Sequence, residues 1–270
     1  MKIIINGLGR IGKLVFRRLC DENLHKNILM VNEKAGSASD QEYFLRYDTV
    51  HGTWGDDLCF ENGCLNYKDH SIAVMTEGSI ESISFPKSEK FLVVDCTGVN
   101  KSEKLLEPYF ERKASYVLIS APIESSNVQN IVYGINHQSI DTSAYKIFTA
   151  ASCTTNCLAP IVKVLEENIG IKHGSITTIH NITNSQTIVD APKNNLRRSR
   201  SGINSLIPTT TGSARAISLI YPELKGRLNG HAVRVPLLNA SLTDCVFEMK
   251  QTVEVDKINQ LFNEASNTYL

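Results

Sequence analysis

Short apolar runs recur along the first half of the chain, each bounded by polar or glycine-rich residues. Runs of this length and setting predict buried strands. They are residues 2–6, 27–33, 91–98 and 116–122. Residues 56–67 look instead like an antiparallel hairpin inserted in the series, with a turn at Glu61-Asn62-Gly63.

Amphipathic segments separate these runs. Apolar residues at helical spacing predict helices over residues 10–22 and 101–113. The apolar residues expected on the buried face of the first helix are Ile11, Leu14, Val15 and Leu19. Strand, helix and strand in this order predict right-handed βαβ units and a mostly parallel sheet.

The pattern changes after Ala150. The expected segments are a helix at 154–168, a strand at 174–183, a polar loop at 193–205 and two strands within 229–251. The last two strands should bend at Pro236. Longer strands with few helices predict an α+β domain with a mixed or antiparallel sheet. The predicted division is 1–151 for a first α/β domain and 152–270 for the second.

Composition narrows the classes of function. The 270 residues include 28 basic and 28 acidic side chains, and this balance argues against a nucleic-acid or anionic-membrane surface. No apolar run reaches the roughly 18 residues that a membrane span needs, and the N-terminal run is too short for a signal peptide. Seven cysteines, an odd number, favour free thiols in a reducing cytosol. We therefore expect a cytoplasmic protein without nucleic-acid or membrane partners.

Gly7, Gly9 and Gly12 form a G-x-G-x-x-G motif directly after the first strand and at the start of the first helix. In such a motif the first glycine makes a tight turn, the second lets the backbone approach a pyrophosphate, and the third allows close packing of helix on strand. The free N–H groups of the helix would bind the phosphates. The motif therefore predicts a dinucleotide-binding (Rossmann) domain.

Glu33 stands at the end of the second strand, about 20 residues after the last glycine, as the ribose-binding carboxylate of such domains does. A carboxylate there favours NAD over NADP, because it would repel a 2′-phosphate. Lys34 follows directly and would weaken that discrimination. The alternative is a solvated glutamate at a strand end.

The stretch "ASCTTNCLAP", residues 151–160, places Cys153 and Cys157 four residues apart. A zinc site would need four ligands, and no second pair is near, so we expect no metal. A C-x-x-C redox pair has a different spacing. Hydroxyl and amide residues around Cys153 predict a helix N-terminus, where a thiol pKa is lowered. Cys157 is expected to pack on the apolar face as a small hydrophobe. Cys153 is thus either a nucleophile or a buried structural cysteine.

A nucleophilic cysteine needs a base, which is usually an imidazole. His180 lies on the strand that follows the predicted helix, where the returning chain could bring it to the helix N-terminus. The alternative for a single histidine on a strand is a structural residue.

Several motifs together resemble the glyceraldehyde-3-phosphate dehydrogenase family along the whole chain. They are "INGLGRIGK", "ASCTTNCLAP", "TTIHNITNSQTIVDAP", "SLIPTTTGSARAI" and "YPELKGRLNGHAVRVP". The stretches "LRYDTVHGTW", "TIVDAPKNNLRRSRSG" and "RVPLLNASLTDCVF" look most like the branch found beside arsenate-resistance genes.

The resemblance implies roles for individual residues. It implies Cys153 as the nucleophile and His180 as the base. For NAD binding it implies Gly7, Gly9, Arg10, Ile11, Gly12, Glu33, Thr97, Gly98 and Ser120. For binding the substrate phosphate and the attacking oxyanion it implies Thr183 and Arg234, and Ser152, Thr154, Thr211 and Gly212.

The implied activity is the phosphorylating oxidation of glyceraldehyde 3-phosphate with NAD, through a thioester on Cys153. The branch implies arsenate as an alternative to inorganic phosphate, in arsenic resistance. The family also implies a homo-oligomer, a tetramer. Two alternatives stay open: an erythrose-4-phosphate dehydrogenase that uses the same residues, and a non-catalytic NAD-binding or interaction protein.

Two departures from the family bear on these expectations. In the family, the loop at 193–202 packs near the cofactor of a neighbouring subunit, and here it carries Arg197, Arg198 and Arg200. These arginines would meet a phosphate or a partner subunit, or form a solvated loop. Family members also continue beyond the position of Leu270, so we expect this chain to be C-terminally short and to end within a helix.

Overall fold

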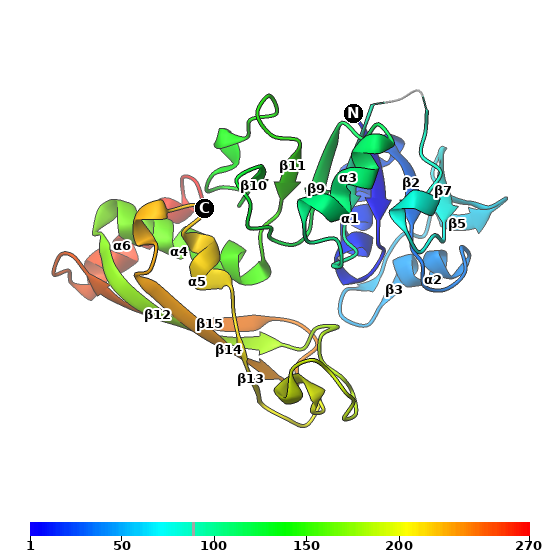
Figure 1. Ribbon diagram of the computed structural model, residues 1–270. Coiled ribbons are helices and arrows are strands. Elements are labelled where there is room, and N and C mark those ends of the chain that lie inside the picture. Colours follow the sequence, from blue (N-terminus) through cyan, green and yellow to red (C-terminus); the bar gives the residue numbers. More distant parts are fainter. Residues whose placement is uncertain (88–89) are drawn as a thin grey trace. The chain divides into compact units, whose positions relative to one another are not determined.

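The chain forms two compact units in the computed structural model, which describes residues 1–87 and 90–270 (Figure 1). The first unit comprises Met1–Asn130 and Asp141–Ala150, and the second comprises Ile131–Ile140 and Ala151–Leu270. Each unit has its own apolar core. Within the described residues, no helix is long and apolar enough to cross a membrane.

The first unit is built on a sheet that has nine strands among its described residues, in the order β10-β11-β9-β8-β1-β2-β7-β6-β5. The strands are β1 Lys2–Asn6, β2 Ile28–Asn32, β5 Leu58–Glu61, β6 Cys64–Tyr67, β7 His70–Met75, β8 Phe91–Asp95, β9 Tyr116–Ile119, β10 Val128–Asn130 and β11 Ile147–Thr149. All neighbours from β10 to β7 pair in parallel. Strands β5 and β6 add the predicted antiparallel hairpin.

Helices cover both faces of this sheet. They are α1 Arg10–Asp21, α2 Asp40–Arg46 and α3 Glu103–Glu111, with the short turns η1 His25–Asn27 and η2 Ile80–Ser82. A two-stranded ribbon, β3 Tyr47–Asp48 and β4 Gly52–Thr53, follows α2. Ile4 packs in the cluster that contains α3, whereas Ile5 packs in the cluster that contains α1 and α2. The continuous apolar run of β1 therefore reflects a strand buried on both faces, as is typical of parallel sheets.

The buried face of α1 differs in part from the predicted one. Val15 and Leu19 pack against the core, as expected, but Ile11 is 48% exposed, and the fully buried positions are Gly12, Phe16, Arg17 and Cys20. The reason is the contact at Gly12, where a Cβ atom would lie 1.8 Å from the carbonyl oxygen of Gly7. This close approach fixes the rotation of the helix about its axis, and it turns the residues at Gly12 and four and eight positions later toward the sheet.

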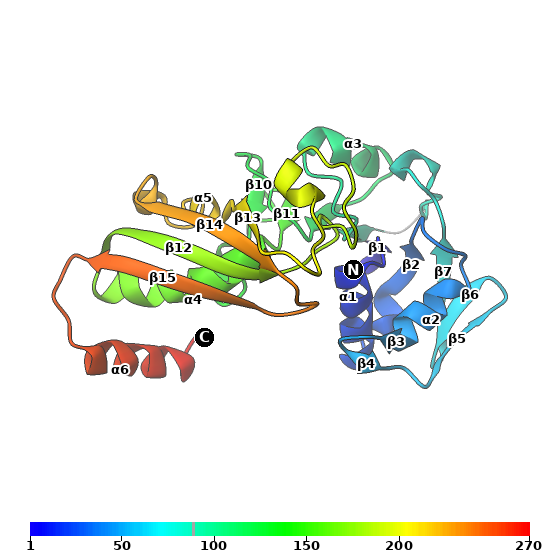
Figure 2. The ribbon, with the colours of Figure 1, turned by 90° about the horizontal axis from the view of Figure 1, so that it is seen from below.

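The second unit has a four-stranded sheet among its described residues, in the order β13-β14-β12-β15 (Figure 2). The strands are β12 Ile171–Asn181, β13 Ile207–Thr210, β14 Leu228–Val235 and β15 Ser241–Met249. Strands β12 and β14 are parallel, and the other pairs are antiparallel. The mixed sheet and the Rossmann-type first unit confirm the predicted fold class.

Among the described residues, three helices share the apolar core on one face of this second sheet: α4 Cys153–Asn168, α5 Ser213–Ile217 and α6 Val255–Ser266. The unit also contains the turns η3 His137–Ser139, η4 Leu196–Ser199 and η5 Pro222–Leu224. The even-numbered residues of β12 from Ile176 to His180 are buried on the helix side. On the opposite face the apolar side chains of Ile179, Leu242 and Val246 are exposed.

Candidate active site

The glycine loop of the first unit lies between β1 and α1. Gly7 has a positive φ of 90°, and a Cβ atom there would lie 2.8 Å from the backbone nitrogen of Thr97. A Cβ atom on Gly9, the N-cap of α1, would meet nothing within 4 Å. The backbone at Gly9 is thus open to a ligand, whereas Gly7 and Gly12 hold the loop against its neighbours. This division of roles fits a pyrophosphate-binding loop.

Glu33 lies against this loop. Its Oε2 accepts a hydrogen bond from the Leu8 N–H at 2.8 Å, and its Oε1 accepts one from the Ala35 N–H at 3.0 Å. A carboxylate oxygen can accept more than one hydrogen bond, so both oxygens keep capacity for ribose hydroxyls. The carboxylate therefore stands where the sequence predicted a ribose acceptor.

The remaining predicted cofactor residues lie at or next to the same edge of the sheet. Thr97 and Gly98 follow β8, Ser120 follows β9, and Arg10 and Ile11 begin α1. Because β9, β8, β1 and β2 are parallel neighbours, their carboxyl ends share one edge. The chain leaves β1 for β2 on one side and returns to β8 on the other, and ligands of open α/β sheets bind at such a switch point. The residues present therefore fit a bound dinucleotide.

A buried polar network beneath the loop was not predicted from the sequence. The hydroxyl of Tyr109 donates to Asp95 Oδ2 at 2.8 Å and accepts from Asn6 Nδ2 at 2.5 Å. Asp95 Oδ1 accepts from the N–H and the hydroxyl of Thr97, and Asn32 Nδ2 donates to Asn6 Oδ1. Burial, followed by the Asp95 charge, raises the pKa of Tyr109. The signal in the sequence was the polar residue that ends each buried run, in "KIIIN", "ILMVN" and "FLVVD".

The thiol of the second unit stands at the N-terminus of α4. Ser152 is the N-cap, and its hydroxyl accepts a hydrogen bond from the Thr155 N–H at 3.1 Å. Cys153 is the first helical residue, and its side chain is exposed. The N–H of a first-turn residue has no partner within the helix, so it is available to an anion. The cap residue therefore places the sulfur beside free backbone donors.

His180 meets this thiol from the end of β12. Its Nε2 lies 3.2 Å from Cys153 Sγ. The hydrogen bond with His180 lowers the pKa of Cys153 to about 7, against the opposing effect of partial burial. A thiol with this pKa is substantially ionised at neutral pH, as a nucleophile requires. Of the two alternatives for Cys153, the geometry favours the nucleophile.

Arg234 completes the group around the imidazole. It lies on β14 in register with His180 on β12. Its Nη1 is 2.6 Å from His180 Nδ1 and 2.9 Å from the carbonyl oxygen of Asn181. Its Nε is buried and has no hydrogen-bond partner among the described residues. A buried guanidinium with an unused donor fits an oxyanion that is bound in the functional state.

The other predicted anion-binding residues are placed less directly. Thr183 Oγ1 bonds with Ser185 Oγ at 2.9 Å, and Thr211 Oγ1 bonds with Ser213 Oγ at 2.7 Å. Gly212 is the N-cap of α5. Thr154 is buried, with Oγ1 at 4.0 Å from Cys153 Sγ. Direct contacts therefore join Cys153, His180 and Arg234, whereas the hydroxyls of Thr183 and Thr211 bond within their own turns.

Cys157 departs from its prediction as a packing residue. Its side chain is exposed, and its Sγ is 3.8 Å from Thr243 Oγ1. The buried stripe of α4 runs through Thr154, Leu158 and Val162 instead, and Cys157 lies just outside it. The second cysteine is thus accessible to solvent, and its hydrogen-bond partner among the described residues is a threonine hydroxyl rather than an imidazole.

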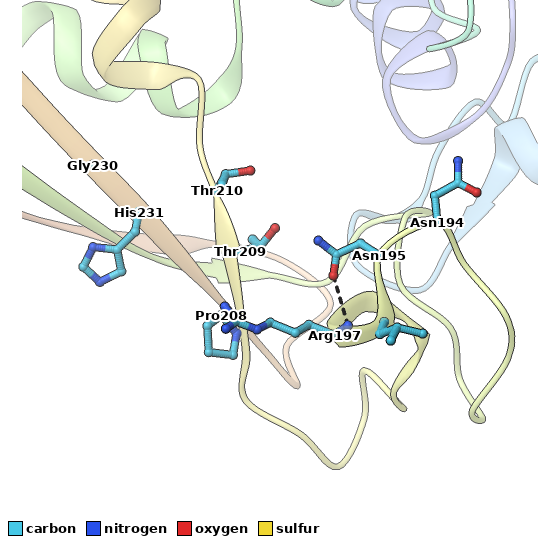
Figure 3. Close-up of a pocket in the computed structure, with 9 residues that line it drawn as sticks. Asn194, Asn195, Arg197, Pro208, Thr209, Thr210, Gly230 and His231 are labelled. Carbon is cyan, nitrogen blue, oxygen red and sulfur yellow. Dashed lines mark hydrogen bonds between the residues drawn. The ribbon is translucent and has the colours of Figure 1, made fainter. Parts of the chain in front are cut away.

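The second unit also contains a pocket of about 670 Å³ away from the thiol (Figure 3). Its lining residues are Asn194, Asn195, Leu196, Arg197, Pro208, Thr209, Thr210, Gly230 and His231. Figure 3 shows the Asn195 side chain accepting a hydrogen bond from the Arg197 N–H, at 3.0 Å. Cys153, His180 and Arg234 do not line this pocket, so we do not assign the reaction to it.

Comparison with known proteins covers both units. Residues 1–103 match the family model "Glyceraldehyde 3-phosphate dehydrogenase, NAD binding domain", and residues 152–270 match the C-terminal domain of the same family. Glyceraldehyde-3-phosphate dehydrogenase 3 of Nostoc sp. is 46% identical over 270 residues, which cover 98% of this chain and 78% of the relative. Glyceraldehyde-3-phosphate dehydrogenase 1 of Bacillus cereus is 39% identical over 265 residues, with the same coverage.

Glyceraldehyde-3-phosphate dehydrogenase of Geobacillus stearothermophilus is likewise 39% identical, over 266 residues that cover 98% of this chain and 78% of the relative. The chain thus spans about four fifths of these relatives. Two family models in sequence order, and identity maintained over nearly the whole chain, show that this protein belongs to the glyceraldehyde 3-phosphate dehydrogenase family.

Proposed function

We propose that this chain is an NAD-dependent phosphorylating dehydrogenase that oxidises glyceraldehyde 3-phosphate through a thioester on Cys153. The observation that carries the proposal is the pairing of Cys153 Sγ with His180 Nε2 at 3.2 Å, at the N-terminus of α4. An ionisable thiol, an adjacent imidazole and free backbone donors are the groups that covalent catalysis on an aldehyde requires.

The first step is attack of the Cys153 thiolate on the aldehyde carbon. A carbon–sulfur bond forms, and the carbonyl oxygen becomes the alkoxide of a thiohemiacetal. The backbone N–H of Cys153 and the imidazole of His180 stabilise this charge, because both lie beside the sulfur. The imidazolium of His180, which has taken the thiol proton, donates that proton from Nε2 to the alkoxide, so the neutral thiohemiacetal forms and a neutral imidazole is left.

The second step is oxidation. His180 takes the hydroxyl proton of the thiohemiacetal as the carbon loses hydride, and a thioester remains on Cys153. When NAD is bound, its nicotinamide supplies the hydride acceptor. Gly7, Gly9 and Gly12 would hold its pyrophosphate, and Glu33 would hold its adenosine ribose.

The third step transfers the acyl group. A phosphate oxygen attacks the thioester carbon, the carbon–sulfur bond breaks, and the acyl phosphate leaves with Cys153 restored as the thiolate. Ser152, Thr154, Thr211 and Gly212 are proposed to bind the attacking oxyanion, and Thr183 and Arg234 the phosphate of the substrate. The unpartnered Nε of Arg234 supports the latter. Arsenate has the same tetrahedral shape and charge, so we propose it as an alternative acceptor.

The test is NADH formation from glyceraldehyde 3-phosphate, NAD and phosphate. We expect Cys153→Ser to abolish turnover while NAD binding is kept. Cys157→Ser is the matched control, because it removes the second exposed thiol of α4 and should leave turnover unchanged. Turnover that survives in Cys153→Ser would refute the nucleophile. Parallel assays with arsenate and with erythrose 4-phosphate identify the acceptor and the aldehyde.

We also propose that the chain assembles as a homotetramer. The exposed apolar side chains of Ile179, Leu242 and Val246 lie on the face of the second sheet that the helices leave open. Exposed apolar surface on a sheet is typical of subunit interfaces. Sedimentation velocity should give the mass of four chains; a mass of one chain at micromolar concentration would contradict the assembly.

A further inference from the structure

Four buried polar side chains form a strip across the sheet of the first unit, beneath the glycine loop. They are Asn32 at the end of β2, Asn6 at the end of β1, Asp95 at the end of β8 and Tyr109 on α3. Each of them is at most 5% exposed. Buried polar groups destabilise a fold unless they are hydrogen-bonded, so the partners of these four residues decide what the strip does.

The two ends of the strip determine the direction of its hydrogen bonds. At one end the backbone N–H of Glu77, which follows β7, donates to Asn32 Oδ1 at 2.8 Å, so the amide nitrogen of Asn32 is free to donate onward. Asn32 Nδ2 donates to Asn6 Oδ1 at 2.8 Å, and Asn6 Nδ2 donates to the Tyr109 hydroxyl at 2.5 Å. At the other end the carboxylate of Asp95 can only accept, so the Tyr109 hydroxyl donates to its Oδ2, at 2.8 Å. One arrangement of donors and acceptors therefore satisfies the strip.

The carboxylate of Asp95 also holds the turn that follows β8. Its Oδ1 accepts from the Thr97 N–H at 2.9 Å and from the Thr97 hydroxyl at 2.7 Å. Its Oδ2 accepts from Asn100 Nδ2 at 2.7 Å as well as from Tyr109. Three of these four donors belong to the turn, and the fourth comes from α3. The Tyr109 hydroxyl thus holds the carboxylate from the core, and the carboxylate holds both ends of the turn.

The turn between Thr97 and Asn100 has an open backbone at the cofactor edge of the sheet. Gly98 has a φ of 70°, a conformation that favours glycine, and a Cβ atom there would meet nothing within 4 Å. Gly9, at the start of α1, is open in the same way. The turn also contacts the glycine loop, since a Cβ atom on Gly7 would lie 2.8 Å from the Thr97 nitrogen. Two open glycines on adjoining loops suit a dinucleotide that lies directly against the backbone.

We propose that Tyr109 is a positioning residue for the cofactor: through Asp95 it holds the turn at residues 97–100 in the conformation that binds NAD. The inference rests on the binding of NAD in the first unit, which is part of the proposed function. Tyr109 is fully buried, so its effect on a ligand passes through the residues to which it is hydrogen-bonded. With the hydroxyl the turn is ordered before NAD binds. Without the hydroxyl the ligand has to order the turn, and this cost lowers the affinity.

The first measurement is the dissociation constant of NAD, by titration calorimetry in the absence of an aldehyde. Tyr109→Phe removes the hydroxyl and keeps the ring that packs edge-on against Phe85. We expect the dissociation constant to rise by about 10-fold, the effect of ordering roughly one residue of the turn on binding. In the NADH assay the KM for NAD should rise by the same factor, whereas kcat at saturating NAD should change little, because the thiol and the imidazole lie outside the strip.

The second measurement follows the turn itself. Hydrogen–deuterium exchange, read on peptides by mass spectrometry, reports the protection of the Thr97 N–H, whose acceptor is Asp95 Oδ1. Without NAD we expect this segment to exchange faster in Tyr109→Phe than in the unmodified protein, and saturating NAD should remove the difference. A peptide over β9, which is paired on both sides, is the internal reference and should exchange alike in both proteins. A general loss of stability would change the reference as well.

Tyr67→Phe is the matched control. It removes another buried phenol hydroxyl of the same unit, on β6, where the ring stacks on Trp54 outside the strip. Its NAD affinity and its exchange at the turn should equal those of the unmodified protein. Asn100→Ala is a second variant, because its amide donates to the same oxygen of Asp95 from a partly exposed position. It should also weaken NAD binding, and it leaves the buried strip in place.

Three results would overturn the inference: an NAD dissociation constant in Tyr109→Phe equal to that of the unmodified protein, unchanged exchange at Thr97 in that variant, or an equal loss of affinity in Tyr67→Phe. If Tyr109→Phe does not fold, unchanged NAD affinity in Asn100→Ala overturns the inference in its place. A protein that binds no NAD contradicts the proposed function and this inference with it. NAD binding that does not depend on Tyr109 refutes the positioning role alone.

Discussion

Replacing His180 with leucine, which cannot form a hydrogen bond, tests how the thiol is activated. His180 is buried, and its Nε2 is 3.2 Å from Cys153 Sγ. This hydrogen bond is the main cause that lowers the pKa of Cys153 to about 7. In His180→Leu that cause is removed, and partial burial of the sulfur, which opposes ionisation, remains. We therefore expect the pKa of Cys153 to rise to at least the value of an ordinary cysteine, about 8.5.

The consequence for reactivity changes sign with pH. At pH 7 a thiol of pKa about 7 is half ionised, whereas a thiol of pKa about 8.5 is roughly 3% ionised, a fall of about 16-fold. The more basic thiolate is intrinsically more nucleophilic, by roughly 5-fold for about 1.5 pKa units at a Brønsted coefficient of about 0.45. The net loss at pH 7 is thus about 3-fold, and at pH 10 the variant should be faster by about 5-fold.

The assay is stopped-flow reaction with an aromatic disulfide reagent between pH 5.5 and 10. It is run in a Cys157→Ser background, because Cys157 is also exposed and would add its own signal. Cys153→Ser in the same background gives the rate to subtract. The rate is plotted against pH for the protein with His180 and for the His180 variant, both in the Cys157→Ser background. If the two curves have the same midpoint pH, or if they do not cross, His180 does not set the pKa of Cys153. Circular dichroism confirms that the variant is folded.

Three further substitutions test the first unit. Gly12→Ala would place a Cβ atom 1.8 Å from the Gly7 carbonyl oxygen, so we expect a lower melting temperature. A Cβ atom at Gly9 meets nothing within 4 Å, so Gly9→Ala should change the free energy of unfolding by less than about 1 kcal/mol. The same Cβ atom would stand where the pyrophosphate approaches the backbone, so Gly9→Ala should weaken NAD binding. Equal effects of the two on stability would contradict the division of roles in the loop. Tyr109→Phe leaves Asp95 Oδ2 without the donated hydrogen bond, and we expect it to lower the free energy of unfolding in urea by about 1–3 kcal/mol. An unchanged free energy of unfolding would mean that the hydrogen bonds among Tyr109, Asp95 and Asn6 do not stabilise the fold.

Much of the fold follows from local patterns. The strand runs, the hairpin and a helix at 154–168, which the structure begins at Cys153, were predicted, because apolar period and cap residues act over a few positions. The exposure of Ile11 and the burial of Phe16 and Cys20 on α1 were not predicted, since they depend on the contact of Gly12 with Gly7. That contact is visible only once β1 and α1 are packed together.

The site was predicted in part for the same reason. The position of Cys153 at a helix N-terminus follows from the hydroxyl and amide residues around it, and the structure identifies Ser152 as the cap. The contact of His180 with the sulfur depends on how β12 returns against α4, and the contact with Arg234 depends on the register of β12 with β14. Hydrophobic period does not determine which residue of one strand stands opposite which residue of another. The resemblance to a family supplied what the pattern could not.

The parallel pairing of β12 and β14 has a consequence for folding. It aligns Gly174 with Leu228 and His180 with Arg234, each 54 positions apart in the chain. Contacts between residues so distant in sequence form slowly, because a long loop must close before the pairing stabilises it. Helix α4 can form early from local contacts, with Cys153 at its end. The chain should therefore carry an ordinary thiol for most of its folding time, and the reactive one should appear only as the final strands join.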